Sequence, residues 1–283
     1  MRSACLLLLS AAFLAGPAPA QTPAQPPTTS AVAPSPDLAG IAHIALRVHD
    51  IAASTAFYQK LGFEKAFELS RNGQVYETFI KINDHQFIEL YPADAKNPQV
   101  GFLHVCFEGR NLQAAHDYYV AHGATPNAVR TAGAGNLLFT MPGPATPTGP
   151  QNMEYTQYMP ASMHSKDVGQ HLGANRIATG IVAVAIAAED PPAAVAFYTQ
   201  KAGFTRDPHA PDNTTQLAIP GAPGQSIVLV AAEQLGYKAA FGLNTSSGKA
   251  ASALKQRGIE VTEIEGQTLV TDPDGNYIGF AAK

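Results

Sequence analysis

Histidine and glutamate residues interrupt four apolar stretches of this sequence. Each has apolar neighbours on both sides, and the four are His43, Glu89, His104 and Glu154. Imidazole and carboxylate groups are ligands of divalent metals, and a carboxylate can also act as a general base. A lone carboxylate in an apolar strand costs free energy unless it is solvated, paired or bound to a cation. Taken singly, each is an ordinary residue of a half-buried strand, so the interpretation depends on whether the fold gathers them.

A repeated unit contains these residues and predicts how they are positioned. Residues 56–63 read AFYQKLGF, and residues 196–204 read AFYTQKAGF. Each copy reads as a helix that follows a strand and ends at a glycine, which accepts the left-handed conformation. Asp50 and Asp190 precede the two helices, where a carboxylate can accept hydrogen bonds from the first backbone amides.

Two weaker copies of the unit follow the two clear ones, with a strand and a helix over residues 101–122 and over 238–257. Short alternating strands come after every helix. We expect them at residues 74–82 with 86–91, 137–141 with 152–158, 215–219 with 226–230, and 267–271 with 276–281. Four units form two domains of two units each. The predicted boundaries are 38–168 for domain 1, 169–178 for a linker and 179–283 for domain 2.

The order of these elements resembles the vicinal oxygen chelate superfamily, which includes glyoxalases, bleomycin-resistance proteins and extradiol dioxygenases. The resemblance rests on the repeated helix end, on IAHIALRV at 41–48 and on the turn DPDGN at 272–276. It covers residue 41 to the C-terminus. It implies an α+β fold of four βαβββ modules paired into two domains, each a curled mixed β-sheet cup with flanking helices.

In that superfamily, the first and last strands of two modules supply the ligands of one divalent metal ion. Carried over position by position, the resemblance implies that His43, Glu89, His104 and Glu154 are the metal ligands. Side chains two apart share a face of a strand, so one face of each strand can present its ligand. This nitrogen and oxygen set suits Mn, Fe, Co, Ni or higher-coordinate Zn.

The resemblance also implies the chemistry. A metal with open positions can hold two neighbouring oxygens of a substrate and act as a Lewis acid. In four-ligand relatives such as glyoxalase I, a ligand glutamate is the general base, which implies Glu154 here, with Glu89 as the second candidate. The favoured function is a glyoxalase-like isomerase or lyase that acts on a small oxygenated substrate. The alternatives are an iron-dependent extradiol-type dioxygenase that uses His43, His104 and Glu154, and a metal-free binding protein of the bleomycin-resistance type.

Domain 2 repeats the architecture without the candidate ligands. In the alignment of the repeats, the residues at or near the four positions are Ala183 for His43, Leu229 for Glu89, Ala239 and Ala240 for His104, and Gly279 for Glu154. Eight of the nine histidines precede residue 172. A structural or substrate-shaping role therefore suits domain 2 better than catalysis.

Three features of domain 1 keep alternatives open. A proline-rich turn over residues 142–150 replaces the acidic turn of domain 2 and makes the position of Glu154 less defined. Residues 157–176 are either a linker or a segment that folds over the cup and offers His164 or Lys166 to an anionic substrate. Cys106 lies two residues from His104, so it either lines the cup or is a small buried residue.

The N-terminus predicts export. Residues 1–20 read as a secretory signal peptide that ends in an A-x-A cleavage site, and residues 21–37 read as a disordered tether rich in Pro, Ala and Thr. The expected product is periplasmic or extracellular and has no membrane segment after cleavage, so a glutathione-dependent reaction is not expected. Cys106 would be the only cysteine left, which excludes an intramolecular disulfide and a thiolate-rich zinc site.

Composition sets the remaining limits. The chain has 283 residues, of which 46% are hydrophobic and 14% charged, as expected for two globular domains. The formal net charge is -4, and the Lys and Arg residues are scattered, so nucleic-acid binding has no electrostatic basis. We expect a small-molecule substrate as the partner, and a homodimer is compatible with the sequence.

Overall fold

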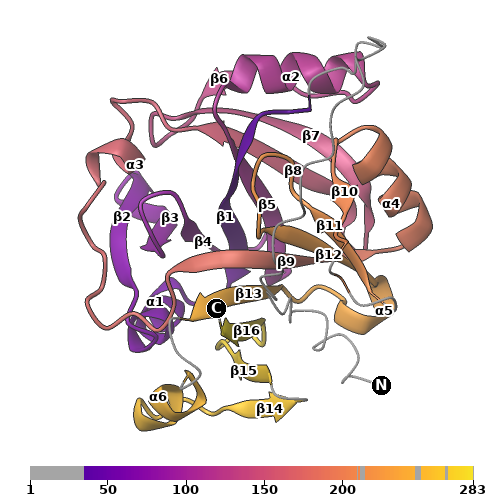
Figure 1. Cartoon of the computed structure of the whole chain (residues 1–283). Coiled ribbons are helices and arrows are strands. Elements are labelled where there is room, and N and C mark those ends of the chain that lie inside the picture. Colours follow the sequence, from indigo (N-terminus) through magenta and orange to yellow (C-terminus); the bar gives the residue numbers. More distant parts are fainter. Residues whose placement is uncertain (1–34, 209, 211–213, 246–249, 265–266, 283) are drawn as a thin grey trace, which may run out of the picture.

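The computed structural model describes residues 35–208, 210, 214–245, 250–264 and 267–282. The predicted signal peptide, and the predicted tether up to residue 34, lie outside the described residues. The described residues form two eight-stranded mixed sheets with flanking helices (Figure 1). None of the described helices is long and apolar enough to cross a membrane.

The first sheet has the strand order β2-β3-β4-β1-β5-β8-β7-β6. Its strands are β1 (Leu38–Val48), β2 (Glu64–Arg71), β3 (Gln74–Lys81), β4 (Phe87–Pro92), β5 (Gly101–Gly109), β6 (Arg130–Thr131), β7 (Leu137–Thr146) and β8 (Gly149–Gln157). Its helices are α1 (Ile51–Lys60) and α2 (Leu112–Ala121), and the short α3 (Met163–Lys166) follows the sheet.

The second sheet repeats this order as β10-β11-β12-β9-β13-β16-β15-β14. Its strands are β9 (Gly180–Ala188), β10 (Thr205–Arg206), β11 (Thr215–Ala218), β12 (Ser226–Ala231), β13 (Ala240–Thr245), β14 (Thr262–Ile264), β15 (Gln267–Thr271) and β16 (Tyr277–Ala282). Its helices are α4 (Pro191–Gln200), α5 (Ala232–Leu235) and α6 (Ala250–Gln256).

Both sheets are built from two modules joined at their first strands. In the first sheet β1 pairs antiparallel with β5, while β1 and β4, and likewise β5 and β8, are parallel. The second sheet has the same pattern around β9 and β13. The predicted α+β fold of four paired modules is confirmed. Neither sheet closes into a barrel, because β2 and β6, and also β10 and β14, remain edge strands within the described residues.

The local signals for the helix ends act as expected. The Asp50 carboxylate accepts hydrogen bonds from the amides of Ala52 and Ala53, and Asp190 accepts one from Ala193. Gly62 and Gly203 follow the helices with φ of +86° and +77°, a conformation that other residues adopt only with strain. These caps fix where each helix leaves its sheet, and so they fix the start of the strands that follow.

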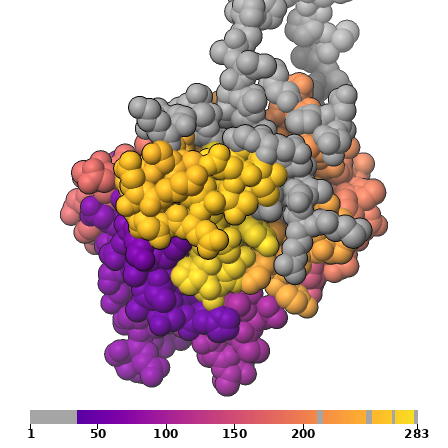
Figure 2. Space-filling model, turned by 90° about the horizontal axis from the view of Figure 1, so that it is seen from below, coloured from indigo at the N-terminus to yellow at the C-terminus, as the bar shows by residue number. Residues whose placement is uncertain are grey.

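One apolar core joins the two sheets. Ile44, Leu46 and Val48 on one face of β1 belong to the same buried cluster as Val184 and Ile186 of β9. The C-terminal strands lie directly against the first module in the space-filling view (Figure 2). Since β1 and β9 turn their aliphatic faces toward this shared core, the opposite face of β1 presents His43, while the opposite face of β9 packs in a second buried cluster with Val228, Val230 and Leu235.

The two copies of the repeated tyrosine each make a hydrogen bond to the other sheet. The hydroxyl of Tyr58 in α1 donates to Asp272 Oδ2 in the turn before β16, at 3.2 Å. The hydroxyl of Tyr198 in α4 donates to Gln151 Oε1 in β8, at 2.6 Å. The repeated motif therefore also serves the packing of the two sheets.

The proline-rich segment expected as a turn is mostly strand. β7 continues to Thr146 and β8 begins at Gly149, so the turn is short, and the register shifts between Pro142 and Ala145. The neighbouring strand β6 pairs only with Leu137 and Leu138. Beyond that point no described strand pairs with this side of β7, where the carbonyls of Thr140 and Ala145 accept from the amides of Asn127 and Glu189, so proline costs no ladder hydrogen bond.

Candidate metal centre

Two histidines from adjacent central strands face one another. His43 lies in β1 and His104 in β5, and in the antiparallel pairing His43 is opposite Cys106 while Ala45 is opposite His104. The distance from His43 Nε2 to His104 Nε2 is 3.0 Å. Both side chains are buried, with exposed fractions of 3% and 7%.

The two predicted glutamates approach opposite edges of the His43 ring. Glu154 of β8 places Oε1 3.5 Å from His43 Nε2, and its Oε2 lies 3.8 Å from His104 Nε2. Glu89 of β4 places Oε1 2.9 Å from His43 Nδ1. The strands β4, β1, β5 and β8 are consecutive in the sheet, and each contributes one polar side chain to the same face. The structure thus brings all four predicted residues together.

The donor atoms suit a divalent cation. Burial lowers the pKa of both His43 and His104, and the proximity of His43 lowers that of His104 further, so both rings are neutral and each can use a nitrogen lone pair. Two ligand atoms about 2.1 Å from one ion lie roughly 3 Å apart when they subtend a right angle. The observed separation of the two Nε2 atoms matches that spacing. His43, Glu89 and His104 have donor atoms within 4.8 Å of one another.

Carboxyl groups crowd this site. Burial raises the pKa of Glu89 to about 8 and that of Glu154 to about 7. Glu77 of β3, whose pKa burial also raises to about 8, shares the Tyr91 hydroxyl with Glu89, at 2.7 Å from Glu77 Oε1 and 3.0 Å from Glu89 Oε2. One hydroxyl hydrogen cannot serve both contacts, so one of the two glutamates carries a proton. A bound cation would lower these pKa values by compensating the negative charge.

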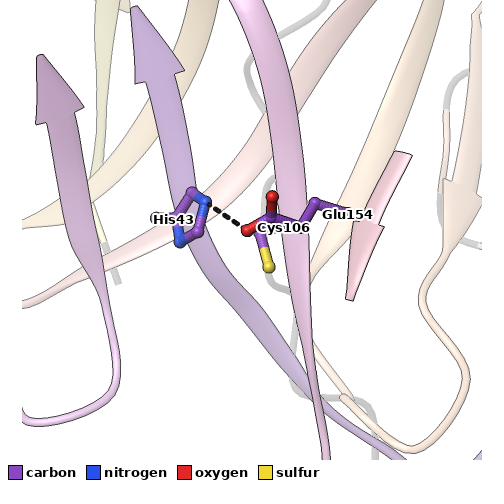
Figure 3. A group of neighbouring side chains, drawn as sticks. All are labelled: His43, Cys106 and Glu154. Carbon is purple, nitrogen blue, oxygen red and sulfur yellow. Dashed lines mark ion pairs between the residues drawn. The ribbon is translucent and has the colours of Figure 1, made fainter. Parts of the chain in front are cut away.

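Cys106 lies on the inner face beside these groups. Figure 3 shows its thiol next to Glu154, with His43 facing that carboxylate. The side chain is fully buried, and its sulfur, a His43 nitrogen and a Glu154 oxygen lie within 4.8 Å of one another. Burial, with a further contribution from Glu154, raises the pKa of the thiol well above its usual value. Cys106 is therefore both a small buried residue and a neighbour of the candidate ligands.

Comparisons with known proteins identify the fold around this site. A family model for the Glyoxalase/Bleomycin resistance protein/Dioxygenase superfamily matches residues 40–153. Those residues form a domain of this superfamily. A comparison with curated protein sequences finds no match.

Several solved structures share the fold of this superfamily domain and its repeat. An extradiol ring-cleaving dioxygenase from B. fuscum aligns with a TM-score of 0.63 and 16% identity, over 89% of this chain and 74% of its own. The Mn(II)-bound glyoxalase from Novosphingobium aromaticivorans aligns with a TM-score of 0.63 and 17% identity, over 87% of this chain and 82% of its own. The 2,3-dioxygenase LapB from Pseudomonas sp. KL28 aligns with a TM-score of 0.63 and 14% identity, over 87% of this chain and 93% of its own. At these identities the likeness concerns the fold alone.

A cavity of about 300 Å³ opens from the candidate ligands of the superfamily domain. Besides His43, Glu89 and Glu154, it is lined by groups that we did not single out in the sequence, among them Glu77, Tyr91, Asn136 and two arginines. Strand alternation contains part of the signal, since Tyr91 lies two residues after Glu89 and shares its face. The edge-strand residues give no such signal, because only the curl of the sheet brings them to the cavity.

The segment after β8 reaches this cavity through His164. That side chain is 2% exposed, stacks on Tyr158 at 4.3 Å between ring centroids, and lines the cavity. Burial lowers the pKa of His164 to about 3, so the ring is neutral. Lys166 points to solvent and does not line the cavity. Lys81 of β3 anchors the segment through an ion pair with Asp167 at 2.7 Å.

The second sheet places other residues at the four ligand positions. The strand registers put Ala183 at the position of His43, Ala240 at that of His104 and Gly279 at that of Glu154. The match of Leu229 to Glu89 was wrong by one residue. Val228 pairs with Ala185 as Glu89 pairs with Ala45, whereas Leu229 faces the shared core. None of these four side chains can ligate a metal.

Proposed function

We propose that the chain is a divalent-metal-dependent enzyme of glyoxalase-like isomerase or lyase type that acts on a small oxygenated substrate. The observation that carries this proposal is the convergence of two neutral imidazoles, the buried Glu89 and the partly buried Glu154 on one face of the first sheet. In the proposed site His43, His104, Glu89 and Glu154 hold the ion. Mn, Fe, Co, Ni and Zn all suit such a donor set.

The cation would supply Lewis-acid polarisation of substrate oxygens. The glutamates would transfer a proton from one atom of the substrate to another. Glu154 faces the cavity, and its carboxylate oxygens are placed to accept a proton from the substrate carbon. Returning that proton to a neighbouring carbon or oxygen completes an isomerisation. Glu89, with a pKa of about 8, is the second candidate for this role.

One observation favours a second function. Glu89 Oε1 lies 2.9 Å from Nδ1 of His43, although not in hydrogen-bond geometry, while His104 and Glu154 face Nε2. A carboxylate on the far nitrogen of a ligand histidine orients the ring without binding the ion. The remaining donors would then be two histidines and one carboxylate, the set typical of non-heme Fe(II) oxygenases. An extradiol-type dioxygenase is therefore the alternative, and the Glu89 side chain distinguishes the two.

The first test is elemental analysis of the purified protein beside a His43→Ala/His104→Ala variant, before and after reconstitution with Mn, Fe, Co, Ni and Zn. We expect about one ion per chain in the wild type and none in the variant. No ion in the wild type under any of these conditions would refute both metal-dependent functions and leave a binding protein.

The second test separates the two metal-dependent functions. Solvent deuterium exchange into hydroxyacetone, followed by NMR, reports redox-neutral proton transfer, and oxygen uptake with catechol reports ring cleavage. We expect Glu89→Gln to abolish most of the exchange. A wild type that consumes oxygen with catechol and catalyses no exchange would favour the dioxygenase, whereas exchange that is unchanged in Glu89→Gln would refute a role for Glu89 in the proton transfer. Glu68→Gln on the exposed edge strand β2 is the matched control.

We also propose that the protein is exported. The predicted signal peptide and tether support this, and the proposal predicts a mature chain that begins near Gln21 in the periplasm or medium. N-terminal sequencing of the fractionated protein tests it. A chain recovered only from the cytoplasm with its first twenty residues intact would refute it.

A further inference from the structure

We propose that the substrate is a small carboxylate anion whose charged end is held by Arg71 and Arg130 at the mouth of the cavity. This inference rests on the proposed function, because it assumes that the other end of the substrate presents its oxygens to the ion between His43 and His104. It assigns a charge and an orientation to a substrate whose class is otherwise open.

The two arginines come from opposite edges of the first sheet. Arg71 is the last residue of β2 and Arg130 is the first residue of β6, the two edge strands, and both line the cavity. The curl of the sheet brings these edges together. A β-carbon placed on Gly133, just after β6, would lie 3.0 Å from Tyr76 Oη and 3.1 Å from Leu69 Cδ1. The loop after β6 therefore lies against β2 and β3.

The positive charges at the mouth are not neutralised by protein groups. Among the described residues, neither guanidinium group has a carboxylate within ion-pair distance. Arg71 lies over the ring of Tyr76, with its guanidinium carbon 5.4 Å from the ring centroid. The carboxyl groups of the cavity are at the inner end, where they surround the His43 ring. The cavity is thus divided into an inner end for a cation and an outer end for an anion.

Two buried polar groups between these ends lack partners. Neither ring nitrogen of His164 has a hydrogen-bond partner, and the same holds for Asn136 Oδ1, whose residue is 5% exposed. Both residues line the cavity. Buried polar groups are nearly always hydrogen-bonded in native proteins, and these three atoms, which are themselves shielded from solvent, are exceptions in the wall of the cavity.

A planar carboxylate group fits the two arginines at the outer end better than a spherical anion does. The planar guanidinium group matches the two oxygens of a carboxylate with two parallel hydrogen bonds. The cavity volume of about 300 Å³ is at the lower limit for small-molecule sites, roughly 300–1,000 Å³. The occupant is therefore small, and the inference assigns its single charged group to the two arginines that line the same cavity.

The test uses zinc-loaded protein and two probes of nearly equal shape, 3,4-dihydroxybenzoate and 3,4-dihydroxybenzamide. Both offer vicinal oxygens to the ion, and only the first carries a carboxylate. Isothermal titration calorimetry gives the dissociation constants. We expect the wild type to bind the benzoate at least about 10-fold more tightly than the benzamide, since hydrogen bonds to charged groups are the stronger class. The preference should fall in Arg71→Gln and Arg130→Gln and vanish in the double variant.

The control is Arg206→Gln on β10, the edge strand of the second sheet, where an exposed arginine has the same charge but lies outside the cavity. It should keep the full preference. Equal binding of the two probes by the wild type, failure of the benzoate to bind, or a preference that survives in the double variant would overturn the inference. Zinc content is measured on the same samples. A wild type that does not hold zinc would refute the proposed function, while a wild type that holds zinc and binds the two probes equally would refute only this inference.

Discussion

Replacing Glu89 by glutamine should stabilise the metal-free protein at high pH and weaken the metal-loaded protein. Glu89 is 3% exposed, and burial raises its pKa to about 8 from 4.5. Between these values the folded protein holds a proton that the unfolded chain has released. The stability that this protonation contributes is complete below about pH 4.5 and is lost as the pH rises through about 8.

The size of the pH dependence follows from the one proton that Glu89 binds in the folded protein. The free energy of unfolding of the metal-free wild type should fall with pH by up to about 1.4 kcal/mol per pH unit for Glu89 alone. Glu77 and Glu154, whose pKa values are also raised, add to the slope in the same window. Glutamine carries no charge and can still accept the hydrogen bond from Tyr91. The variant should therefore show a shallower slope and exceed the wild type in stability at pH 8.

Metal reverses the ranking. Loss of a group that orients a ligand costs about 10–100-fold in metal affinity, and loss of a ligand at least as much. With metal at 1,000 times the wild-type Kd, the bound ion stabilises the wild type by about 4.1 kcal/mol, and a 100-fold weaker variant by about 1.4 kcal/mol. Glu89→Gln should therefore lose roughly 2.7 kcal/mol of metal-induced stabilisation.

Urea unfolding followed by circular dichroism, from pH 5.5 to 8 with chelator or with zinc, measures both effects. Glu68→Gln, an exposed glutamate on β2 with a salt bridge to Lys65, serves as the control and should change neither slope nor metal response. A metal-free Glu89→Gln protein with the same pH slope as the wild type would refute the assignment of a buried, proton-binding carboxyl. Equal metal stabilisation of the two proteins would refute a role for Glu89 at the metal.

Three further substitutions test the scaffold by chemical denaturation. Lys81→Met removes the ammonium group that pairs with Asp167 and Asp84, leaves Asp167 with His171 alone, and should cost about 3 kcal/mol; a loss below about 1 kcal/mol would contradict the anchoring of the segment that carries His164. Phe107→Ala removes a fully buried ring of the core shared by both sheets and should cost about 3–5 kcal/mol in one cooperative transition, whereas two separate transitions would contradict a shared core. Asp190→Ala removes the hydrogen bond to the Ala193 amide and should cost about 1 kcal/mol, and an unchanged midpoint would contradict the capping role.

The fold could be predicted because its signals are local and occur more than once. Asp50 and Asp190 cap helices through bonds to amides two or three residues away, and the glycines after those helices accept a backbone conformation that other residues avoid. The alternation of side chains along β1 already shows in the sequence that His43 lies on the face opposite to the aliphatic residues. Repetition then gave the pairing of modules, because each copy needed a partner to cover its apolar face.

The sequence pattern misled the prediction at two places, one where alternation is weak and one where prolines are frequent. In residues 226–230 every side chain but Ser226 is aliphatic, so the pattern cannot distinguish the cup face from the core face, and Leu229 was chosen where the register places Val228. The prolines of residues 142–150 read as a turn. Only the two-residue length of β6 shows that no neighbouring strand pairs with this part of β7, which therefore tolerates the prolines.

The sequence by itself determined the types of the four candidate ligands, the strands that carry them and the absence of equivalents in the second half. Tertiary structure decided everything that depends on the curl of the sheet and on side-chain direction. It brought Arg71 and Arg130 from distant edges to one cavity, placed His164 inside it, and set Glu89 against the Nδ1 edge of His43 rather than beside His104. These relations arise from contacts between residues far apart in the chain, and no local propensity or spacing encodes them.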